Sequence, residues 1–173
     1  MDSHPQQVDA SETGATVPAA AGGRAFDASD YVTLTRIIER LHRRFLDVLR
    51  SELARWDVVD LNAVQCLLLS NIGDEEINVR NLMDKGYYQG SNASYNIKKL
   101  VEAGYLEQHK SPHDRRATML KASAKGLALC ARVHELEGTI AERFADGGAR
   151  IDDALDTLRS LERLWADIVR YGV

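Results

Sequence analysis

The chain is poor in cysteine, with only Cys66 and Cys130 among its 173 residues. Both stand in apolar stretches, and neither belongs to a CxxC or Cys/His spacing, which argues against a zinc site and against a disulfide framework. We therefore expect no metal and no cofactor, and two free thiols that suit a reducing cytoplasm. Sensing of oxidation by either thiol stays open, but the apolar neighbours of Cys66 favour a structural place in the core.

Long apolar runs and catalytic motifs are also missing. No stretch approaches the roughly 20 apolar residues of a membrane span. The first residues hold no basic segment followed by an apolar one, so we expect no secretory signal either. The sequence has no GxGxxG, no P-loop, no HExxH and no Ser or Cys in a nucleophile context, and its carboxylates do not cluster. We predict that the protein is not an enzyme; turnover of a bound ligand would contradict this.

The composition suits one domain with a hydrophobic core, because 45% of the residues are hydrophobic and 28% are charged. The net charge of −4 does not by itself suggest a nucleic-acid partner. The charge is unevenly spread, however. Between residues 78 and 126, nine Lys and Arg residues accompany four Asp and Glu residues, so this segment carries +5 and the remainder −9. A basic module in an acidic chain predicts a local phosphate-binding face, with an ordinary solvated surface as the alternative.

Helical periodicity organises most of the chain beyond its first residues. Residues 1–27 are rich in Ala, Gly, Ser, Thr, Gln and Pro and have no apolar period, which predicts a disordered tail. Three later segments carry apolar side chains at spacings of three and four, which predicts long amphipathic helices. Ser29 or Asp30 is expected to cap the first of them. The three segments are residues 29–55, 123–144 and 151–170.

A second group of signals lies between the long helices. Asn62 followed by Gln65 predicts a capping box that opens a short, nearly all-apolar helix at the centre of the domain. The long helices carry more apolar surface than so small a module covers, which favours a two-fold dimer over a monomeric helical bundle. We predict a single domain over 28–173, with a winged module at about 57–125 and dimerisation helices at about 29–55 and 123–170.

The order of elements between residues 78 and 126 is the most informative pattern. Asn78 is expected to cap a short helix, and a second helix runs from Ser91 to Gly104. Two expected strands, residues 105–110 and 117–121, enclose a basic tip, and Ser123 then caps the next helix. This order predicts a winged helix-turn-helix: a mainly α fold with a small β-hairpin wing, flanked by long dimerisation helices. Such a helix suits a major groove and such a hairpin tip suits the backbone or minor groove, so we expect a DNA-binding regulator.

Candidate DNA contacts on the second helix are polar and basic. Short polar side chains near its start suit base edges, and Asn pairs bidentately with adenine. The two lysines that follow suit phosphates, which position the protein without reading sequence. Ser91 as a simple N-cap, Asn92 as part of the turn, and Tyr95 and Asn96 as packing residues remain alternatives. The candidates are Ser91, Asn92, Ser94, Tyr95, Lys98 and Lys99.

Candidate contacts in the wing are Arg115 and Arg116, because an Arg at a hairpin tip suits a narrow minor groove, where the negative potential is enhanced. Asp114 does not suit DNA, and we expect it to hold an Arg side chain by a charge-assisted hydrogen bond. The alternative is a solvated charged loop.

These residues resemble the MarR family of winged-helix regulators over roughly residues 29–168. The wing has the family's Asp-x-Arg pattern as Asp114 to Arg116, then a strand, then Ser123-Ala124-Lys125-Gly126. The recognition helix ends in the family's way, with Leu100, then Gly104-Tyr105-Leu106. Residues 38–45 and 86–100 further resemble an LdtR-like alphaproteobacterial branch.

The resemblance implies a homodimer that binds pseudo-palindromic double-stranded DNA. It also assigns Asp114 and Arg116 to the supporting and DNA-contacting roles in the wing. It implies a pocket for a small-molecule effector between the dimerisation helices and the DNA-binding lobe. The side chains expected there are Phe45, Leu49, Trp56 and Leu68, each of which equally suits a plain core.

Two functions therefore remain in competition. The leading one is a homodimeric, sequence-specific transcriptional regulator modulated by a small ligand. The alternative is a winged-helix adaptor that binds protein without specific DNA binding, which the acidic charge of the whole chain allows. A DNA affinity that does not fall with salt, or no DNA binding, favours the adaptor.

Overall fold

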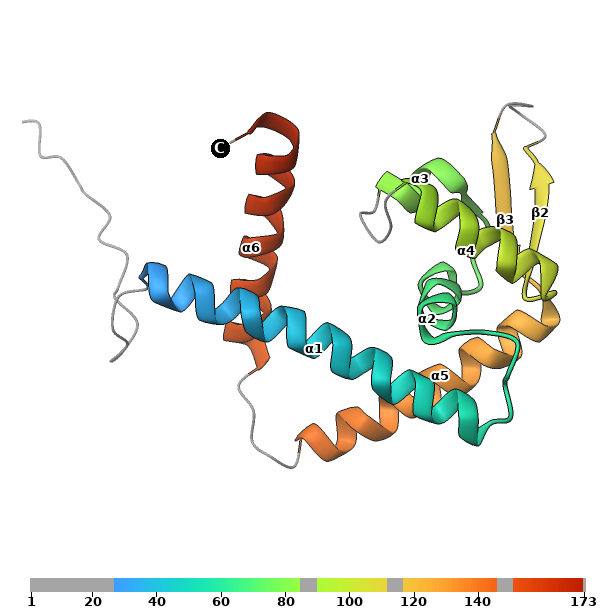
Figure 1. Ribbon diagram of the computed structural model, residues 1–173, viewed down its shortest axis with the longest axis horizontal. Coiled ribbons are helices and arrows are strands. Elements are labelled where there is room, and N and C mark those ends of the chain that lie inside the picture. The colour runs from blue at the N-terminus through green and yellow to red at the C-terminus, as the bar shows by residue number, and fades with distance from the viewer. Residues whose placement is uncertain (1–26, 85–89, 112–116, 146–150, 173) are drawn as a thin grey trace, which may run out of the picture. The chain divides into compact units, whose positions relative to one another are not determined.

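The structure, a computed structural model, describes residues 27–84, 90–111, 117–145 and 151–172 (Figure 1). The chain divides into two units between Leu41 and His42. It is mainly helical with one small sheet, which confirms the predicted fold class. The helices are α1 (Ala28–Arg55), α2 (Ala63–Ile72), α3 (Val79–Asp84), α4 (Gly90–Glu102), α5 (Ala124–Ala145) and α6 (Ile151–Tyr171), and the strands are β1 (Ile77–Asn78), β2 (Leu106–Lys110) and β3 (Thr118–Ala122).

The sheet is antiparallel and has the order β1-β3-β2. Its central strand β3 pairs with β2 from Lys110 opposite Thr118 to Leu106 opposite Ala122, and β1 pairs with the middle of β3. Leu120 and Ala122 of β3 are buried while Lys121 between them is exposed, as expected for a strand with one face on the core. The predicted hairpin is confirmed: β2 begins one residue later than expected, and β3 is shifted by one residue toward the C-terminus.

Local capping fixes α2 as predicted. The Asn62 side chain accepts a hydrogen bond from the Gln65 amide at 2.9 Å, and the Gln65 side chain accepts one from the Asn62 amide at 3.0 Å. This reciprocal pair satisfies two amides that the first turn of the helix leaves free. At the other end, Gly73 has a positive φ of 65° and donates to the Leu69 carbonyl. The helix between these caps is buried on most of its surface.

The expected cap of α1 was wrong. Asp27, immediately before the helix, accepts hydrogen bonds from the amides of Ser29 (2.7 Å) and Asp30 (3.0 Å). The Asp30 carboxylate in turn accepts from the Asp27 amide at 3.1 Å, so the two acids form a capping box. The cap lies at Asp27 because the helix begins at Ala28, one residue earlier than the apolar pattern indicated. The rest of the expected tail, residues 1–26, lies outside the described part of the chain.

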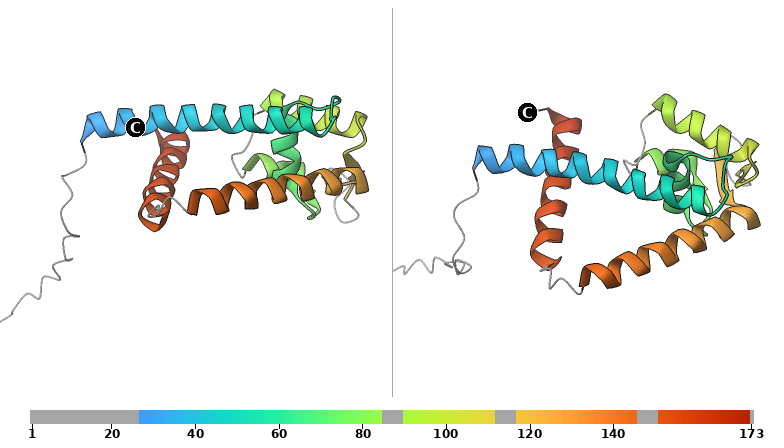
Figure 2. Two further views of the ribbon diagram at one scale, coloured as in Figure 1. Left: turned by 90° about the horizontal axis from the view of Figure 1, so that it is seen from below. Right: turned by 60° about the horizontal axis from the view of Figure 1, so that its bottom comes forward.

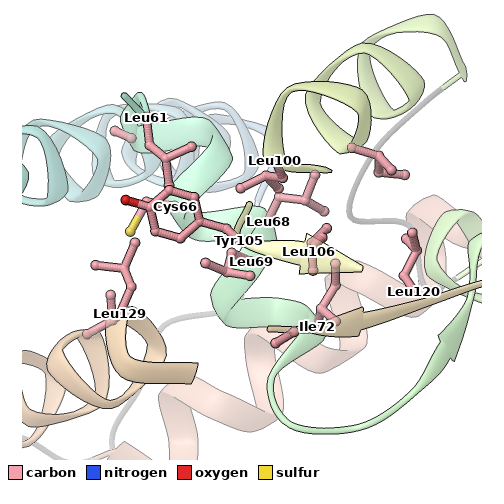
Figure 3. Packing of buried hydrophobic residues seen from close by; sticks show 14 of the residues in the cluster. Leu61, Cys66, Leu68, Leu69, Ile72, Leu100, Tyr105, Leu106, Leu120 and Leu129 are labelled. Atoms are coloured by element: carbon pink, nitrogen blue, oxygen red, sulfur yellow. The ribbon is translucent and has the colours of Figure 1, made fainter. Parts of the chain in front are cut away.

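The hydrophobic core of the second unit is centred on α2 (Figure 3). Leu68 and Leu69 of α2 are fully buried, as are Leu100 of α4 and Leu120 of β3. The figure shows the labelled side chains of α2, α4, the two long strands and α5 converging on one another. This core joins the recognition helix and the hairpin into a single body, and burial of several such side chains is the main force that holds them together.

The residues expected around an effector pocket belong to the same core. Leu49 and Leu68 have no exposed surface, and Phe45 and Trp56 are partly buried against the cluster. The guanidinium of Arg132 also covers the Trp56 ring, 4.7 Å from its centroid. These contacts bear out the alternative in which the four side chains are core residues.

The first turns of α5 pack on α2 and β3, as two further views show (Figure 2). Among the described residues, the structure offers no helix that combines the length and apolarity needed to cross a membrane. Over the same residues it brings together no group of His, Cys, Asp and Glu suited to a metal ion.

Candidate nucleic-acid interface

Helix α4 is oriented by the apolar side chains that it buries. Ala93 and Leu100 have no exposed surface and Ile97 only 5%, at the spacing of one helix face, and Val101 is partly buried. Asn96 is also buried, at 8% exposure, so the polar run of this helix does not lie wholly on one side. With these positions on the core, the remaining face of α4 is directed to solvent.

A glycine ends α4 and aims the chain into β2. Gly104 has a φ of 76°, and its amide donates to the Val101 carbonyl while the Tyr105 amide donates to the Leu100 carbonyl. These two bonds form a Schellman motif, which requires a left-handed residue after the helix. The family-like Leu100 to Leu106 run is therefore the end of α4 and its turn into the sheet.

The exposed face of α4 carries five of the candidate DNA-contacting residues. Tyr95 is 58% exposed, and the side chains of Lys98 and Lys99 are 74% and 44% exposed. Asn92 and Ser94 are exposed as well. Ser91 lies in the first turn, where the structure describes only the backbone. The wing residues Asp114, Arg115 and Arg116 lie outside the described residues.

A groove separates this face from the hairpin. Its volume is about 760 Å³, and it opens between the start of α3, the solvent side of α4 and the outer parts of β2 and β3. Polar and charged side chains line much of it, so it suits a hydrated, charged partner better than an apolar one. The lining residues are Asn78, Val79, Arg80, Ser94, Ile97, Lys98, Val101, Glu102, Gln108, Ala117 and Thr118.

The cations around the groove differ in their partners. Lys98 and Lys99 both pair with Glu102, at 3.7 Å and 2.8 Å, and the hydrogen bond from Lys99 is the main cause that lowers the pKa of that carboxyl. Arg80 also lines the groove, and its backbone amide donates to the Asn78 side chain, which caps α3 as predicted. Sequence reasoning did not single out Arg80 or the Glu102 contacts, although Arg80 sits two residues after the predicted cap.

A polar cluster at the base of α4 was also missed. Lys125, in the first turn of α5, donates to the Asp60 carboxylate at 2.7 Å and to the Ala103 carbonyl at 2.9 Å. The Tyr105 hydroxyl donates to the same carboxylate at 2.9 Å. The Lys125 hydrogen bond is the first cause that lowers the pKa of Asp60. This cluster ties the α1–α2 connection, the end of α4 and the start of α5 together.

The residues beside Lys125 tighten the same junction. Ser123 caps α5 as predicted, because its hydroxyl accepts from the Gly126 amide, and it also donates to the Gly104 carbonyl at 2.7 Å. Gly126 packs directly on the backbone of Tyr105, where a Cβ atom would lie 2.2 Å from the carbonyl oxygen. The Ser-Ala-Lys-Gly run thus clamps the C-terminal end of α4 to α5.

The surroundings of the two cysteines shield their thiols from solvent and do not activate them. Cys66 is 1% exposed, and burial raises the pKa of its thiol to about 12. Cys130 is partly buried, donates to the Leu69 carbonyl at 3.6 Å, and has its pKa raised by burial as well. A reactive thiol needs a lowered pKa and access, so both side chains fit structural roles.

Comparison with known proteins supports this geometry. The fold resembles the crystal structure of FabT from Streptococcus pneumoniae in complex with DNA, with a TM-score of 0.65 at 18% identity over 80% of this chain and 99% of that one. It also resembles a cysteine-to-serine mutant of MarR from E. coli complexed with operator DNA, with a TM-score of 0.58 at 22% identity over 80% and 97%. Residues 61–126 match the family model of a winged helix DNA-binding domain.

A curated relative extends the match beyond the winged module. The exopolysaccharide II synthesis transcriptional activator ExpG of Rhizobium meliloti (strain 1021) is 35% identical over 146 residues, which cover 83% of this chain and 75% of that protein. This chain belongs to the MarR family of winged-helix transcriptional regulators. The predicted family is thereby confirmed, and fold and relative together point to a regulator, not to an enzyme. For this MarR-family regulator, the LdtR-like branch stays a prediction.

Proposed function

We propose that this MarR-family regulator binds a pseudo-palindromic double-stranded DNA site as a homodimer, with one winged module on each half-site. The observation that carries the proposal is the exposed polar face of α4, flanked across a groove by the hairpin. A helix in the major groove places its outer face against base edges, and a neighbouring hairpin then follows the DNA backbone. The described face of α4 has the size and polarity for the first of these tasks.

Within this proposal the candidate residues take different parts. Asn92, Ser94 and Tyr95 face base edges, together with Ser91 at the helix start. Lys98 and Lys99 meet phosphates, which add affinity and salt dependence but no sequence preference. Arg115 and Arg116 of the wing reach the minor groove, and Asp114 supports an Arg side chain.

The groove beside α4 suits the sugar-phosphate backbone between those two contacts. It is lined by Arg80 and Lys98, which are donors for phosphate oxygens, and by the hydroxyls of Ser94 and Thr118. The planar guanidinium of Arg80 offers a bidentate donor to a phosphate. Arg80 therefore joins the proposed DNA-contacting set.

Dimerisation is supported by apolar side chains that the single chain leaves in solvent. On α6, Leu155, Leu158 and Trp165 are 36% to 42% exposed and lie along one stripe. Further exposed apolar side chains occur on α1 and α5, among them Leu41 at 61% and Phe144 at 62%. A second copy of the chain is the occupant that removes such surfaces from water with two-fold symmetry.

The dimer is tested by sedimentation equilibrium of the wild type and Leu158→Glu. A charge on the apolar stripe of α6 is expected to raise the dissociation constant by at least tenfold. The control is Ser160→Glu, which adds the same charge on the opposite side of the helix and is expected to leave the dimer intact. A wild type that sediments as a monomer at all concentrations would refute the dimer.

We further propose that a small-molecule effector modulates DNA binding by favouring a dimer in which the two α4 helices are misplaced. Its support is family membership alone, because the four side chains expected around a pocket lie in the core. The test is a fragment library screened for release of a labelled duplex. Fragments that release DNA and also raise the melting temperature would support an effector; none doing so would oppose it.

DNA binding is tested by fluorescence-anisotropy titration against the regulator's own upstream DNA and a scrambled duplex, at several salt concentrations. We expect tight, salt-sensitive preference for the upstream DNA, weakened by Arg116→Ala. Arg55→Ala, which removes an equal charge at the end of α1, is the control and is expected to bind like the wild type. No binding to either duplex at low salt, or binding that does not fall with salt, would replace the regulator with a protein-binding adaptor.

A further inference from the structure

The carboxylate of Glu102 lies among the proposed DNA contacts, where a negative charge repels phosphates. It contacts Lys99 at 2.8 Å and Lys98 at 3.7 Å, and all three side chains are between 44% and 74% exposed. Glu102 and Lys98 both line the groove beside α4, on the side that faces the hairpin. A phosphate that approaches either lysine therefore also approaches this carboxylate.

Helix stability does not account for an acid at this position. Glu102 is the last residue of α4, where the partial negative charge of the helix end disfavours a carboxylate and favours the lysines. The order Lys98 then Glu102 is also the weaker orientation of an i,i+4 ion pair. Exposed pairs of this kind contribute little to folding in any case. The main effect of Glu102 is therefore expected on the binding of other anions by the two lysines.

Arg80 lines the same groove as Lys98. The two lysines of α4 already share the carboxylate of Glu102. A phosphate that binds Lys98 or Lys99 therefore has to displace Glu102 from that lysine.

We propose that Glu102 is an internal competitor with DNA phosphates for Lys98 and Lys99, and that it limits the affinity of this regulator for DNA of any sequence. The inference rests on the proposed DNA-binding function and adds a residue that weakens binding to the set that strengthens it. Because phosphate contacts carry no sequence information, the limit applies equally to specific and scrambled DNA. Base contacts near the start of α4 then account for a larger share of the total affinity.

Salt dependence gives the expected size of the effect. Each phosphate that gains a full ion pair steepens the slope of log affinity against log salt by about 0.9. Glu102→Gln releases two lysines, which gain about one to two phosphate contacts. The slope of log affinity against log salt is therefore expected to steepen by about 0.9 to 1.8. At low salt the corresponding gain in affinity is roughly three- to tenfold. The gain should be the same for the upstream duplex and the scrambled duplex.

The experiment compares Glu102→Gln with Glu107→Gln by fluorescence anisotropy on both duplexes at several salt concentrations. Glu107 is exposed on β2 and pairs with neither lysine. Its side chain lies on the face of the sheet opposite that of its neighbour Gln108, which lines the groove. Both variants remove one negative charge from the winged module, so their difference isolates the contact with the lysines. Thermal melts of both variants check that the fold is kept.

A third comparison separates competition from simple repulsion. In a Lys98→Met, Lys99→Met background, Glu102→Gln is expected to gain no more than Glu107→Gln does, because the contested cations are gone. A gain that persists in that background would overturn the competition and leave only repulsion between Glu102 and DNA. Equal affinities of Glu102→Gln and Glu107→Gln in the otherwise unchanged protein would overturn the proposal as well. If the wild type binds neither duplex, the DNA-binding function fails first and this inference falls with it.

Discussion

The ammonium group of Lys125 lies over the face of the Tyr105 ring, with Nζ 3.9 Å from the ring centroid. The two residues share a third partner, because the Asp60 carboxylate accepts one hydrogen bond from each. Tyr105 follows the end of α4 closely, and Lys125 belongs to the first turn of α5. A cation–π contact and a shared carboxylate therefore hold the end of the recognition helix α4 against the start of α5.

This junction predicts a loss of stability in acid. The Lys125 hydrogen bond lowers the pKa of Asp60 below its ordinary value of 3.8. A carboxyl whose pKa is lowered by folding stabilises the protein at pH values above its ordinary pKa, and the contribution disappears as pH falls through the folded value. We expect Asp60→Asn to lower the melting temperature by a few degrees at neutral pH and by progressively less below pH 3.8.

The measurement is a series of thermal melts of both proteins from neutral pH into acid. Asp74→Asn is the matched control, because Asp74 is exposed and contacts none of the three residues of the junction. A difference between wild type and Asp60→Asn that stays constant into strong acid would contradict the ionic role of Asp60.

The close approach of α5 to Tyr105 predicts that Gly126 tolerates no side chain. A Cβ atom there would lie 2.2 Å from the Tyr105 carbonyl oxygen, and backbone cannot swing aside as a flexible side chain does. Gly126→Ala is expected to lower the free energy of unfolding by about 2 kcal/mol or more, measured by urea denaturation. Gly138→Ala, on the exposed side of the same helix with nothing within 4 Å, is expected to raise it by up to about 1 kcal/mol. Equal effects of the two substitutions would refute this packing.

The end of α1 predicts a stabilising substitution. Asp57 has a φ of 59°, and the amides of Asp57 and Val58 donate to the carbonyls of Ala54 and Leu53 in a Schellman motif. A residue with a Cβ is strained in this left-handed conformation, whereas glycine is not. Asp57→Gly should raise the free energy of unfolding by about 0.5 to 1 kcal/mol. Asp57→Ala should lower it, and a gain for both variants would show that φ is not the cause.

The buried thiols predict a regulator that is insensitive to mild oxidation. Cys66 has a pKa of about 12, so essentially no thiolate is present at neutral pH, and Cys130 is shifted in the same direction. A thiol reagent should label the native protein slowly, Cys66 slowest, and the urea-unfolded protein rapidly. DNA affinity should be unchanged after brief exposure to dilute peroxide. Rapid labelling of Cys66 in the native protein would reopen an oxidation-sensing role.

Much of the fold could be predicted because its signals are local. The capping box of Asn62 and Gln65 joins residues three apart, and the amide of Gly104, which ends α4, donates to the Val101 carbonyl three residues before it. The inward positions Ala93 and Leu100 follow from helical spacing alone. The cap of α1 was misplaced because the pattern indicated a start at residue 29, one residue after the helix begins. An N-cap depends on which side chain reaches the first free amides, which periodicity does not specify.

Sequence alone determined that this protein has a winged helix-turn-helix, with a recognition helix and hairpin of nearly the observed bounds, because helix, turn and cap signals act over a few residues. Only the tertiary structure decided which polar side chains far apart in the sequence meet. Asp60 and Lys125 are 65 residues apart in the chain, and the groove beside α4 draws Arg80, Lys98 and Thr118 from three elements. Such pairs form because core packing brings distant elements together, and short-range patterns carry no record of that geometry.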